Sequence, residues 1–113
     1  DGTIEESTLN VERSSTDDCV TFVCEDLDNA ASLLPSVWAD PSVNYGRVTK
    51  GAAMALKGRL LLFYASPLFN RSNDKARWDA AYTANKAAYD ELTTNGDREL
   101  VGATSKNVCE PLV

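Results

Sequence analysis

The sequence predicts an all-α fold of about three helices, packed as antiparallel pairs of the tetratricopeptide-like type. Apolar residues recur at intervals of three and four in three stretches of the 113 residues, which is the period of an amphipathic helix. Each stretch begins near a capping residue and ends at a proline or an Asn-Gly pair. The connections are short enough to make consecutive helices antiparallel neighbours. The helices are expected at residues 15–34, 47–66 and 74–94, within a single helical segment 1–113 whose ends, 1–14 and 97–113, are irregular.

The first helix is bounded by local signals. Ser15, followed three residues later by Asp18, imitates a capping box, and Asp17 adds a carboxylate at the positive end of the helix dipole. Pro35 ends the helix. The apolar stripe consists of Val20, Val23, Leu27, Ala30 and Leu34, widened by Phe22 and Ala31. We therefore expect a one-sided amphipathic helix.

The second helix is expected to be the central one, because it is apolar around most of its circumference. It follows a predicted loop at residues 35–46, which is interrupted by two prolines and a glycine, and Pro67 ends it. Its small residues would let a neighbouring backbone approach closely: Gly51, Ala52, Ala55 and Gly58. If the chain is a segment without its stacking neighbours, part of the apolar face of this helix should be exposed.

The third helix is expected to begin after Asp74, a good N-cap, and to end at Asn95-Gly96. Gly96 stands where a left-handed cap conformation is common. Three aromatic residues follow the helical period: Trp78, Tyr82 and Tyr89. Their spacing favours packing in the core over ligand binding.

Composition excludes several classes of function. The chain has 11 Lys and Arg against 17 Asp and Glu, a net charge of −6, and no histidine. An acidic chain repels nucleic acid, and without histidine no Ser-His-Asp or Cys-His catalytic group is possible. An enzyme that used carboxylates would need a closely placed pair with one raised pKa, and no such pair is recognisable. We therefore expect no catalytic residue, no nucleic-acid partner and no cofactor.

The acidic residues of the first helix do not predict a metal site. They are Asp17, Asp18, Glu25, Asp26 and Asp28. Their spacing differs from that of an EF-hand loop, and no glycine stands at the turn. A solvated helix face is the expected interpretation.

Three cysteines leave at least one thiol unpaired. Cys19 and Cys24 are five residues apart, a rise of about 7.5 Å in a helix, which exceeds the usual Cα separation for a disulfide. We expect both to lie in the core as small apolar residues. Cys109, in the weakly patterned tail, has no predicted role. The longest apolar stretch is shorter than the span of about 20 residues that a membrane helix needs.

Trp38 and Tyr45 are the candidate ligand-binding residues. Saccharides bind to flat apolar rings that have polar groups nearby, and both rings lie in the predicted loop with Asp40 and Asn44. The alternative is that both rings pack under the loop against the helices.

A helical-repeat pattern is present in part. Ala55 and Pro67 have the twelve-residue separation found in tetratricopeptide repeats, and Trp78 opens the next helix as a repeat would. Arg59 occupies a position that is usually aromatic, and the loop 66–73 is longer than the repeat allows.

Three strings resemble the SusD/RagB family, the surface-exposed nutrient-binding lipoproteins of glycan-uptake systems such as the starch utilisation system in Bacteroidetes. The strings are residues 46–69 (GRVTKGAAMALKGRLLLFYASPLF), residues 75–81 (KARWDAA) and the preceding helix at 13–20, 26–31 and 33–35. They occur in the family's order and cover about residues 13 to 92. Members of the family are far longer, begin with a lipoprotein signal and a lipidated cysteine, and contain four tetratricopeptide-like helix pairs. The chain therefore looks like an internal segment of such a protein, and neither Cys19 nor Cys24 is expected to be the lipidated cysteine.

The resemblance implies a non-enzymatic function. A SusD-like protein captures an oligosaccharide or other nutrient at the outer membrane and delivers it to a SusC-like TonB-dependent transporter. This segment would act as scaffold and docking surface, with the ligand held through the full-length parent. The alternative function is a free-standing helical-repeat module that binds a peptide in the groove between helices.

Overall fold

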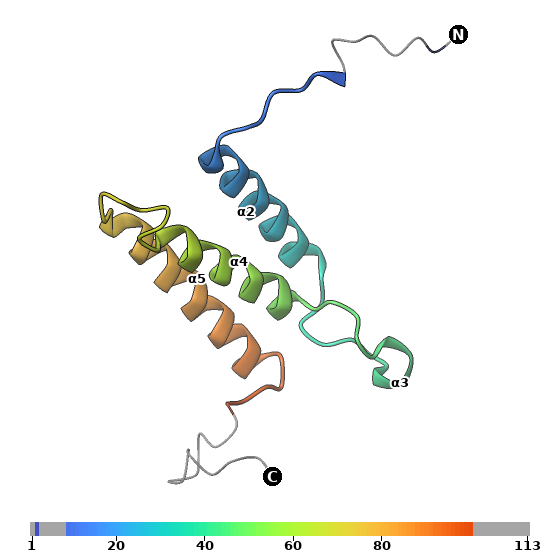
Figure 1. Ribbon diagram of the computed structural model, residues 1–113. Coiled ribbons are helices and arrows are strands. Elements are labelled where there is room, and N and C mark those ends of the chain that lie inside the picture. The colour runs from blue at the N-terminus through green and yellow to red at the C-terminus, as the bar shows by residue number, and fades with distance from the viewer. Residues whose placement is uncertain (1, 3–8, 101–113) are drawn as a thin grey trace, which may run out of the picture.

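The structure is a computed structural model that describes residue 2 and residues 9–100. Within them lie α2 (Thr16–Leu33), α3 (Pro41–Asn44), α4 (Lys50–Ala65) and α5 (Lys75–Thr94). The described residues contain no strand, so the prediction of an all-α fold with about three main helices is confirmed. Figure 1 shows α4 lying between α2 and α5.

The cap of α2 forms as the sequence predicts. The Asp18 amide donates to Ser15 Oγ at 3.1 Å, and Ser15 Oγ donates in turn to Asp18 Oδ2 at 2.7 Å. At the other end the Leu34 amide bonds to the Ala30 carbonyl at 2.9 Å, and Pro35 follows. The expected range 15–34 therefore contains the helix together with its two capping residues.

The connection between α2 and α4 differs from the predicted loop because it contains the one-turn helix α3. Asp40 caps this turn by accepting hydrogen bonds from the amide of Ser42 at 3.0 Å and from its hydroxyl at 2.6 Å. Pro41 occupies the first turn, where its fixed φ suits a helix and its missing N–H is not needed. The Asp40-Pro41 pair, which separates α2 from α4, therefore also begins a short helix of its own.

Helix α4 begins three residues later than the expected residue 47. Thr49 is the N-cap and accepts from the Ala52 amide at 3.4 Å. The residues before it make other bonds: the Arg47 amide donates to the Asn44 carbonyl at 3.1 Å, and the Val48 carbonyl accepts from Trp38. These bonds hold the chain in a turn and delay the helix.

Helix α5 starts as predicted, because the Asp74 side chain accepts from the Ala76 amide at 3.0 Å. The predicted left-handed conformation of Gly96 is wrong, since the positive φ of 51° occurs at Asp97 instead. Gly96 is needed for a different reason: a Cβ there would lie 2.8 Å from the Leu92 carbonyl oxygen. The turn folds back tightly on the last helical residues, and the Gly96 amide bonds to the Glu91 carbonyl at 3.0 Å.

The contact between α4 and α5 depends on small residues spaced by seven. Gly51, Gly58 and Ala65 are all buried. A side chain at Gly51 would overlap Leu92, and one at Gly58 would come within 2.6 Å of the Asn85 side chain. Position 51 thus faces 92 and position 58 faces 85, so the two helices are antiparallel. On α5 the buried residues are also small, Ala81 and Ala88.

Asn70 fixes the loop between α4 and α5. Its side chain is buried and donates to the carbonyls of Ala65 at 3.3 Å and Asp74 at 3.0 Å, while its Oδ1 accepts from the Asp74 amide at 2.7 Å. Every polar atom of this amide is therefore satisfied. The loop joins the end of one helix to the cap of the next through a single side chain.

Helix α2 lies antiparallel to α4 and is attached more loosely. Lys57 binds Asp28 at 2.7 Å, and the Tyr64 hydroxyl donates to Asp17. This bond from a phenol to a carboxylate raises the pKa of Tyr64. Arg77 of α5 lies 4.0 Å above the Tyr64 ring, so all three long helices meet at this end.

No residue of α2 is fully buried, and the expectation for its cysteines is only half met. Cys19 is exposed, so its predicted place in the core is wrong. Cys24 is half-buried, and burial raises the pKa of its thiol. The reason is that α2 packs mainly on α4, which leaves most of its surface open. Cys109 lies outside the described residues.

The core prediction for the α5 aromatics is also wrong. Trp78, Tyr82 and Tyr89 are exposed, Tyr82 to 70%. The buried apolar residues in the described part are instead alanines: Ala53, Ala65, Ala81 and Ala88. Because the backbones of α4 and α5 approach closely, glycines and alanines occupy most of the contact, and the larger rings lie at its flank.

Replacing Gly58 with alanine tests the close approach. Alanine favours a helix by about 1 kcal/mol over glycine, but a Cβ here collides with Asn85, whose amide donates to the carbonyls of Gly58 and Ala81 at 3.0 and 2.8 Å. We expect Gly58→Ala to lower the free energy of unfolding by about 1–2 kcal/mol in a denaturant titration. The double variant Gly58→Ala/Asn85→Ala should recover part of the loss. A more stable single variant would show that the interface is looser than described.

Candidate functional site

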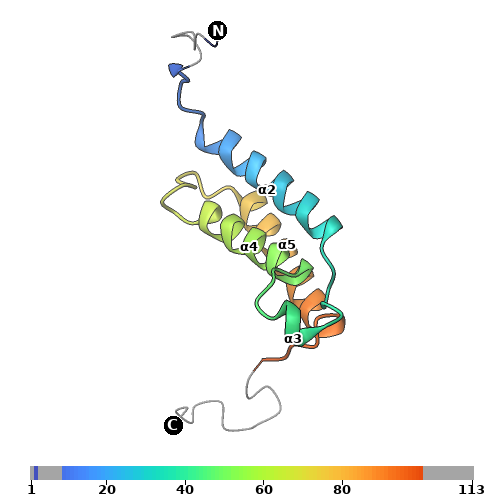
Figure 2. The ribbon, with the colours of Figure 1, turned by 90° about the vertical axis from the view of Figure 1, so that its right-hand side faces the viewer.

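The candidate site is a hollow of about 500 Å³ at one end of the helices. It is lined by residues of the α2–α4 connection, by the start of α4 and by the end of α5, including Trp38, Tyr45, Arg47, Leu92 and Arg98. Figure 2 shows α3 at the same end of the molecule as the C-terminal end of α5. Segments more than 40 residues apart in the sequence therefore form one surface.

Trp38 is held in place from two sides. Its indole Nε1 donates to the Val48 carbonyl at 2.9 Å, and the guanidinium of Arg47 lies 5.5 Å from the ring centroid, within range of a cation–π interaction. The ring is half-buried. It is thus partly packed against its own loop and still contributes to the hollow.

Tyr45 is 93% exposed, so the alternative in which it packs under the loop is wrong. It lines the same hollow as Trp38, and Asn44 lines it as well. Asp40 does not line the hollow, and its carboxylate caps α3. The hydrogen bonds from Ser42 hold the pKa of Asp40 below its ordinary value.

Arg47 and Arg98 are the lining residues that the sequence analysis missed. Arg47 could have been found because it directly follows Gly46, the last residue of the predicted loop. Arg98 carries no such signal, because it joins the hollow only through the pairing of α5 with α4. The Arg98 amide bonds to the Leu92 carbonyl at 3.0 Å, which folds the residue back over the end of α5.

Glu91 joins the segments that form the hollow. Its carboxylate accepts from the Ser36 hydroxyl and from Asn95 Nδ2 at 2.9 Å, and Lys50 lies 3.9 Å away. The side chain is 10% exposed. The hydrogen bonds from Ser36 and Asn95, with a smaller effect of Lys50, lower the pKa of Glu91. One carboxylate therefore ties the α2–α4 connection, the start of α4 and the end of α5 together.

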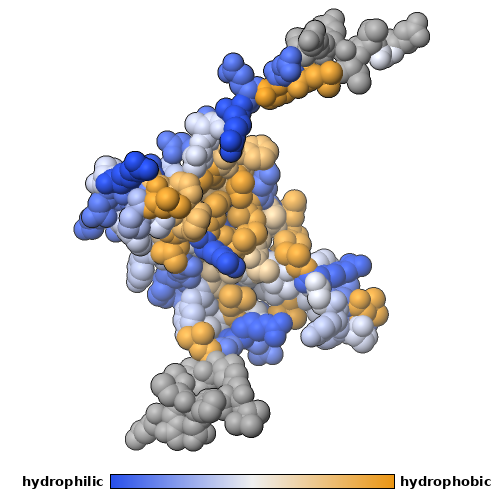
Figure 3. All heavy atoms as spheres, in the orientation of Figure 1, coloured by the Kyte–Doolittle hydropathy of each residue, from blue (hydrophilic) through white to orange (hydrophobic). Residues whose placement is uncertain are grey.

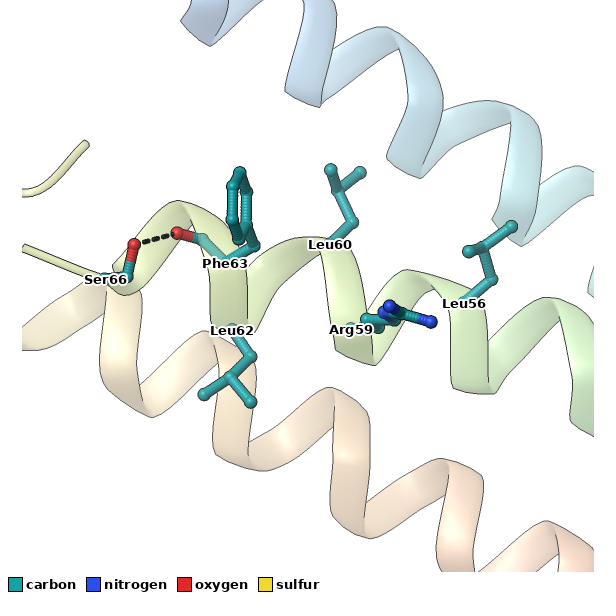
Figure 4. A pocket seen from close by; sticks show the side chains of 6 residues that line it. All are labelled: Leu56, Arg59, Leu60, Leu62, Phe63 and Ser66. Carbon is teal, nitrogen blue, oxygen red and sulfur yellow. Dashed lines mark hydrogen bonds between the residues drawn. The ribbon is translucent and has the colours of Figure 1, made fainter. Parts of the chain in front are cut away.

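A second surface is the open face of α4, defined by Leu56, Arg59, Leu60, Leu62, Phe63 and Ser66. It encloses about 470 Å³, and Figure 4 shows Leu56, Leu60 and Phe63 pointing to the side of α2 while Leu62 points to α5. Phe63 is 57% exposed and meets Phe69 at a centroid distance of 5.0 Å. Figure 3 shows apolar residues gathered across this face of the molecule.

A third depression of about 520 Å³ lies along α4 and α5. Its floor is formed by Met54, Leu61 and small residues of α5, and the Lys57–Asp28 ion pair lines one side of it. It lies between two helices, where a free-standing helical-repeat module would bind a peptide.

The described residues contain neither a metal-binding cluster nor a membrane-spanning helix. No three His, Cys, Asp or Glu side chains are grouped there in a way that would hold a metal ion. None of the helices in this range has the length and apolar character needed to cross a membrane.

No family model, curated protein or solved structure matches this chain. The SusD/RagB resemblance therefore rests on the three sequence strings described above.

The Glu91 cluster predicts a specific pH dependence of stability. Because the folded-state pKa of Glu91 lies below its ordinary value of 4.5, its contribution is present above that value and is lost as the pH falls through the folded-state pKa. We expect Glu91→Gln to be less stable than the parent at neutral pH. It should also lose less stability between about pH 6 and pH 3 in thermal unfolding.

The control is Glu25→Gln, which removes the same charge from an exposed position on α2. It should keep the parent's loss of stability over the same pH range. If Glu91→Gln and the parent lose stability equally on acidification, the cluster does not hold the folded state together.

Proposed function

We propose that the chain is a non-enzymatic helical segment of a SusD-like nutrient-binding protein, which captures a glycan and passes it to a transporter. The observation that carries the proposal is that Trp38 and Tyr45 line one hollow together with Asn44. Aromatic rings bind the C–H faces of a sugar, and an amide side chain bonds its hydroxyls. No reaction chemistry is part of the proposal.

The open face of α4 supports the view that the chain is a segment of a larger helical array. Leu56, Leu62 and Phe63 are each at least half exposed on the helix that is otherwise the most enclosed. Apolar helix faces in repeat arrays are covered by the next helix of the array. On this proposal the segment acts as scaffold, and α4 receives a further helix of the parent protein.

The proposal places the protein at the cell surface as an outer-membrane lipoprotein, with a SusC-like TonB-dependent transporter as partner. These statements follow from the family resemblance. The ligand would be held partly by this chain, at Trp38 and Tyr45, and partly by the rest of the parent.

A free-standing helical interaction module is the second candidate function, and the same open face favours it. A peptide helix with apolar residues one turn apart would cover Leu56, Leu60 and Phe63. The two proposals differ in one property, because only the first requires affinity for a glycan.

The test is electrophoresis of the chain in native gels that contain a panel of polysaccharides. We expect retardation by at least one glycan, and Tyr45→Ala should weaken it by about 2- to 10-fold, the range for loss of an aromatic contact. Tyr45 is suited to this test because its exposed side chain can be removed without disturbing the loop. Val43→Ala is the matched control, since Val43 is also exposed on this segment but does not line the hollow.

The outcomes separate the proposals. Retardation of a longer natural form of the protein, but not of this chain, would place the sugar site outside residues 1–113 and leave this segment as scaffold. If no glycan slows either form, the nutrient-binding proposal fails and the interaction module becomes the better description.

A further inference from the structure

We infer that the hollow at Trp38 and Tyr45 selects saccharides that carry a carboxylate or sulfate group. The inference rests on the proposed function, because it assumes that the hollow takes a sugar, and it adds the chemical class of that sugar. It depends on the charge of the hollow, which differs from the charge of the chain.

The hollow is cationic although the chain has a net charge of −6. Arg47 and Arg98 both line it, and no Asp or Glu of the described residues does. One guanidinium comes from the connection after α3 and the other from the segment after α5, so the pair exists only in the folded chain. A guanidinium binds a carboxylate or sulfate through two parallel hydrogen bonds.

Two carboxylates of the segments that form the hollow, Asp40 and Glu91, are bonded to other groups. Asp40 accepts two hydrogen bonds from Ser42 at the start of α3. Glu91 accepts from Ser36 and Asn95 and lies beside Lys50. Arg47 and Arg98 form no ion pair within the part of the chain that the structure describes, so both guanidiniums are available to a ligand.

The first turn of α4 adds to the positive potential. Thr49, the N-cap of this helix of 16 residues, and Ala52 both line the hollow. The first turn contains no acidic residue that would neutralise the positive end of the helix dipole. An anionic group in the hollow would thus meet two guanidiniums and a helix N-terminus.

The rings and the arginines suit different parts of one ligand. Arg47 lies over the Trp38 ring at 5.5 Å, whereas the Tyr45 ring is 93% exposed. A sugar ring that packs against Tyr45 would bring its acidic substituent toward Arg47 and Arg98. This arrangement gives a uronic acid an advantage over the neutral sugar of the same shape.

The probe is trigalacturonate, compared with its fully methyl-esterified form, which has the same rings without the charge. Trp38 reports binding when the other of the two tryptophans is removed by Trp78→Phe. We expect the acid to bind about tenfold more tightly than the ester, the effect of one charged hydrogen-bonded contact. The preference should decrease as salt is added.

Arg47→Gln and Arg98→Gln should each reduce the preference for the acid. Arg98→Gln is the more informative variant, because Arg47 also contacts the reporter ring. Arg59→Gln is the matched control: it removes the same charge from the open face of α4, outside the hollow. A ring-independent anion site would instead respond to sodium sulfate as strongly as to the saccharide.

Each result bears on the inference separately from the proposed function. Equal binding of acid and ester would overturn the preference for acidic sugars and leave glycan capture intact. Binding of a neutral polysaccharide in the native gels, without binding of trigalacturonate, would likewise overturn the preference for acidic sugars and leave glycan capture intact. An equal loss in Arg59→Gln would show diffuse attraction, and an equal response to sulfate would show a simple anion site; either outcome overturns the inference. Failure of every saccharide would overturn the inference and the assignment of the sugar site to this chain.

Discussion

The close approach of α4 and α5 is the constraint on which the rest of the structure depends. Gly51 and Gly58 of α4 leave room for the Leu92 and Asn85 side chains of α5, and the buried residues of α5 are alanines. Seven residues correspond to two turns, so Gly51, Gly58 and Ala65 stay on one face along the whole helix. This contact fixes the antiparallel register, and the register brings the end of α5 to the start of α4, where the hollow forms.

The same constraint explains where the large apolar side chains lie. Because glycines and alanines occupy most of the contact, the rings of α5 and Leu56 and Leu62 of α4 lie beside it and remain exposed. The described part of the chain therefore buries few large apolar side chains. Asn70 and Glu91 contribute to stability through hydrogen bonds that fix the loops. The resulting surface offers one apolar face to a further helix and one aromatic hollow to a ligand.

The charges around α4 are complementary, with cations on the helix and carboxylates on its neighbours. The helix has cationic residues and no acidic ones, and its two helical neighbours supply the carboxylates: Asp28 pairs with Lys57, and Glu91 lies beside Lys50. The exposed Lys57–Asp28 pair contributes little free energy, whereas Glu91 is also held by hydrogen bonds from Ser36 and Asn95. Arg59 occupies the open face without a carboxylate partner among the described residues, which fits a face whose neighbour is supplied by another helix.

The sequence by itself determined the three long helices and most of their ends, because capping and termination act within three or four residues. Ser15 and Asp74 bond to amides in the first turn of their own helices, and Pro35 and Pro67 end the preceding ones without help from distant residues. It also indicated Trp38 and Tyr45 as candidate ligand-binding residues, because both rings lie in one short connection. The tertiary structure alone decided which faces became buried, and this is why the expected burial of Trp78 and Cys19 was wrong. Periodicity shows that a helix has an apolar side but not how closely its neighbour approaches. Arg98 entered the hollow for the same reason, because only the packing of α5 on α4 brings it near residues about 50 positions earlier in the chain.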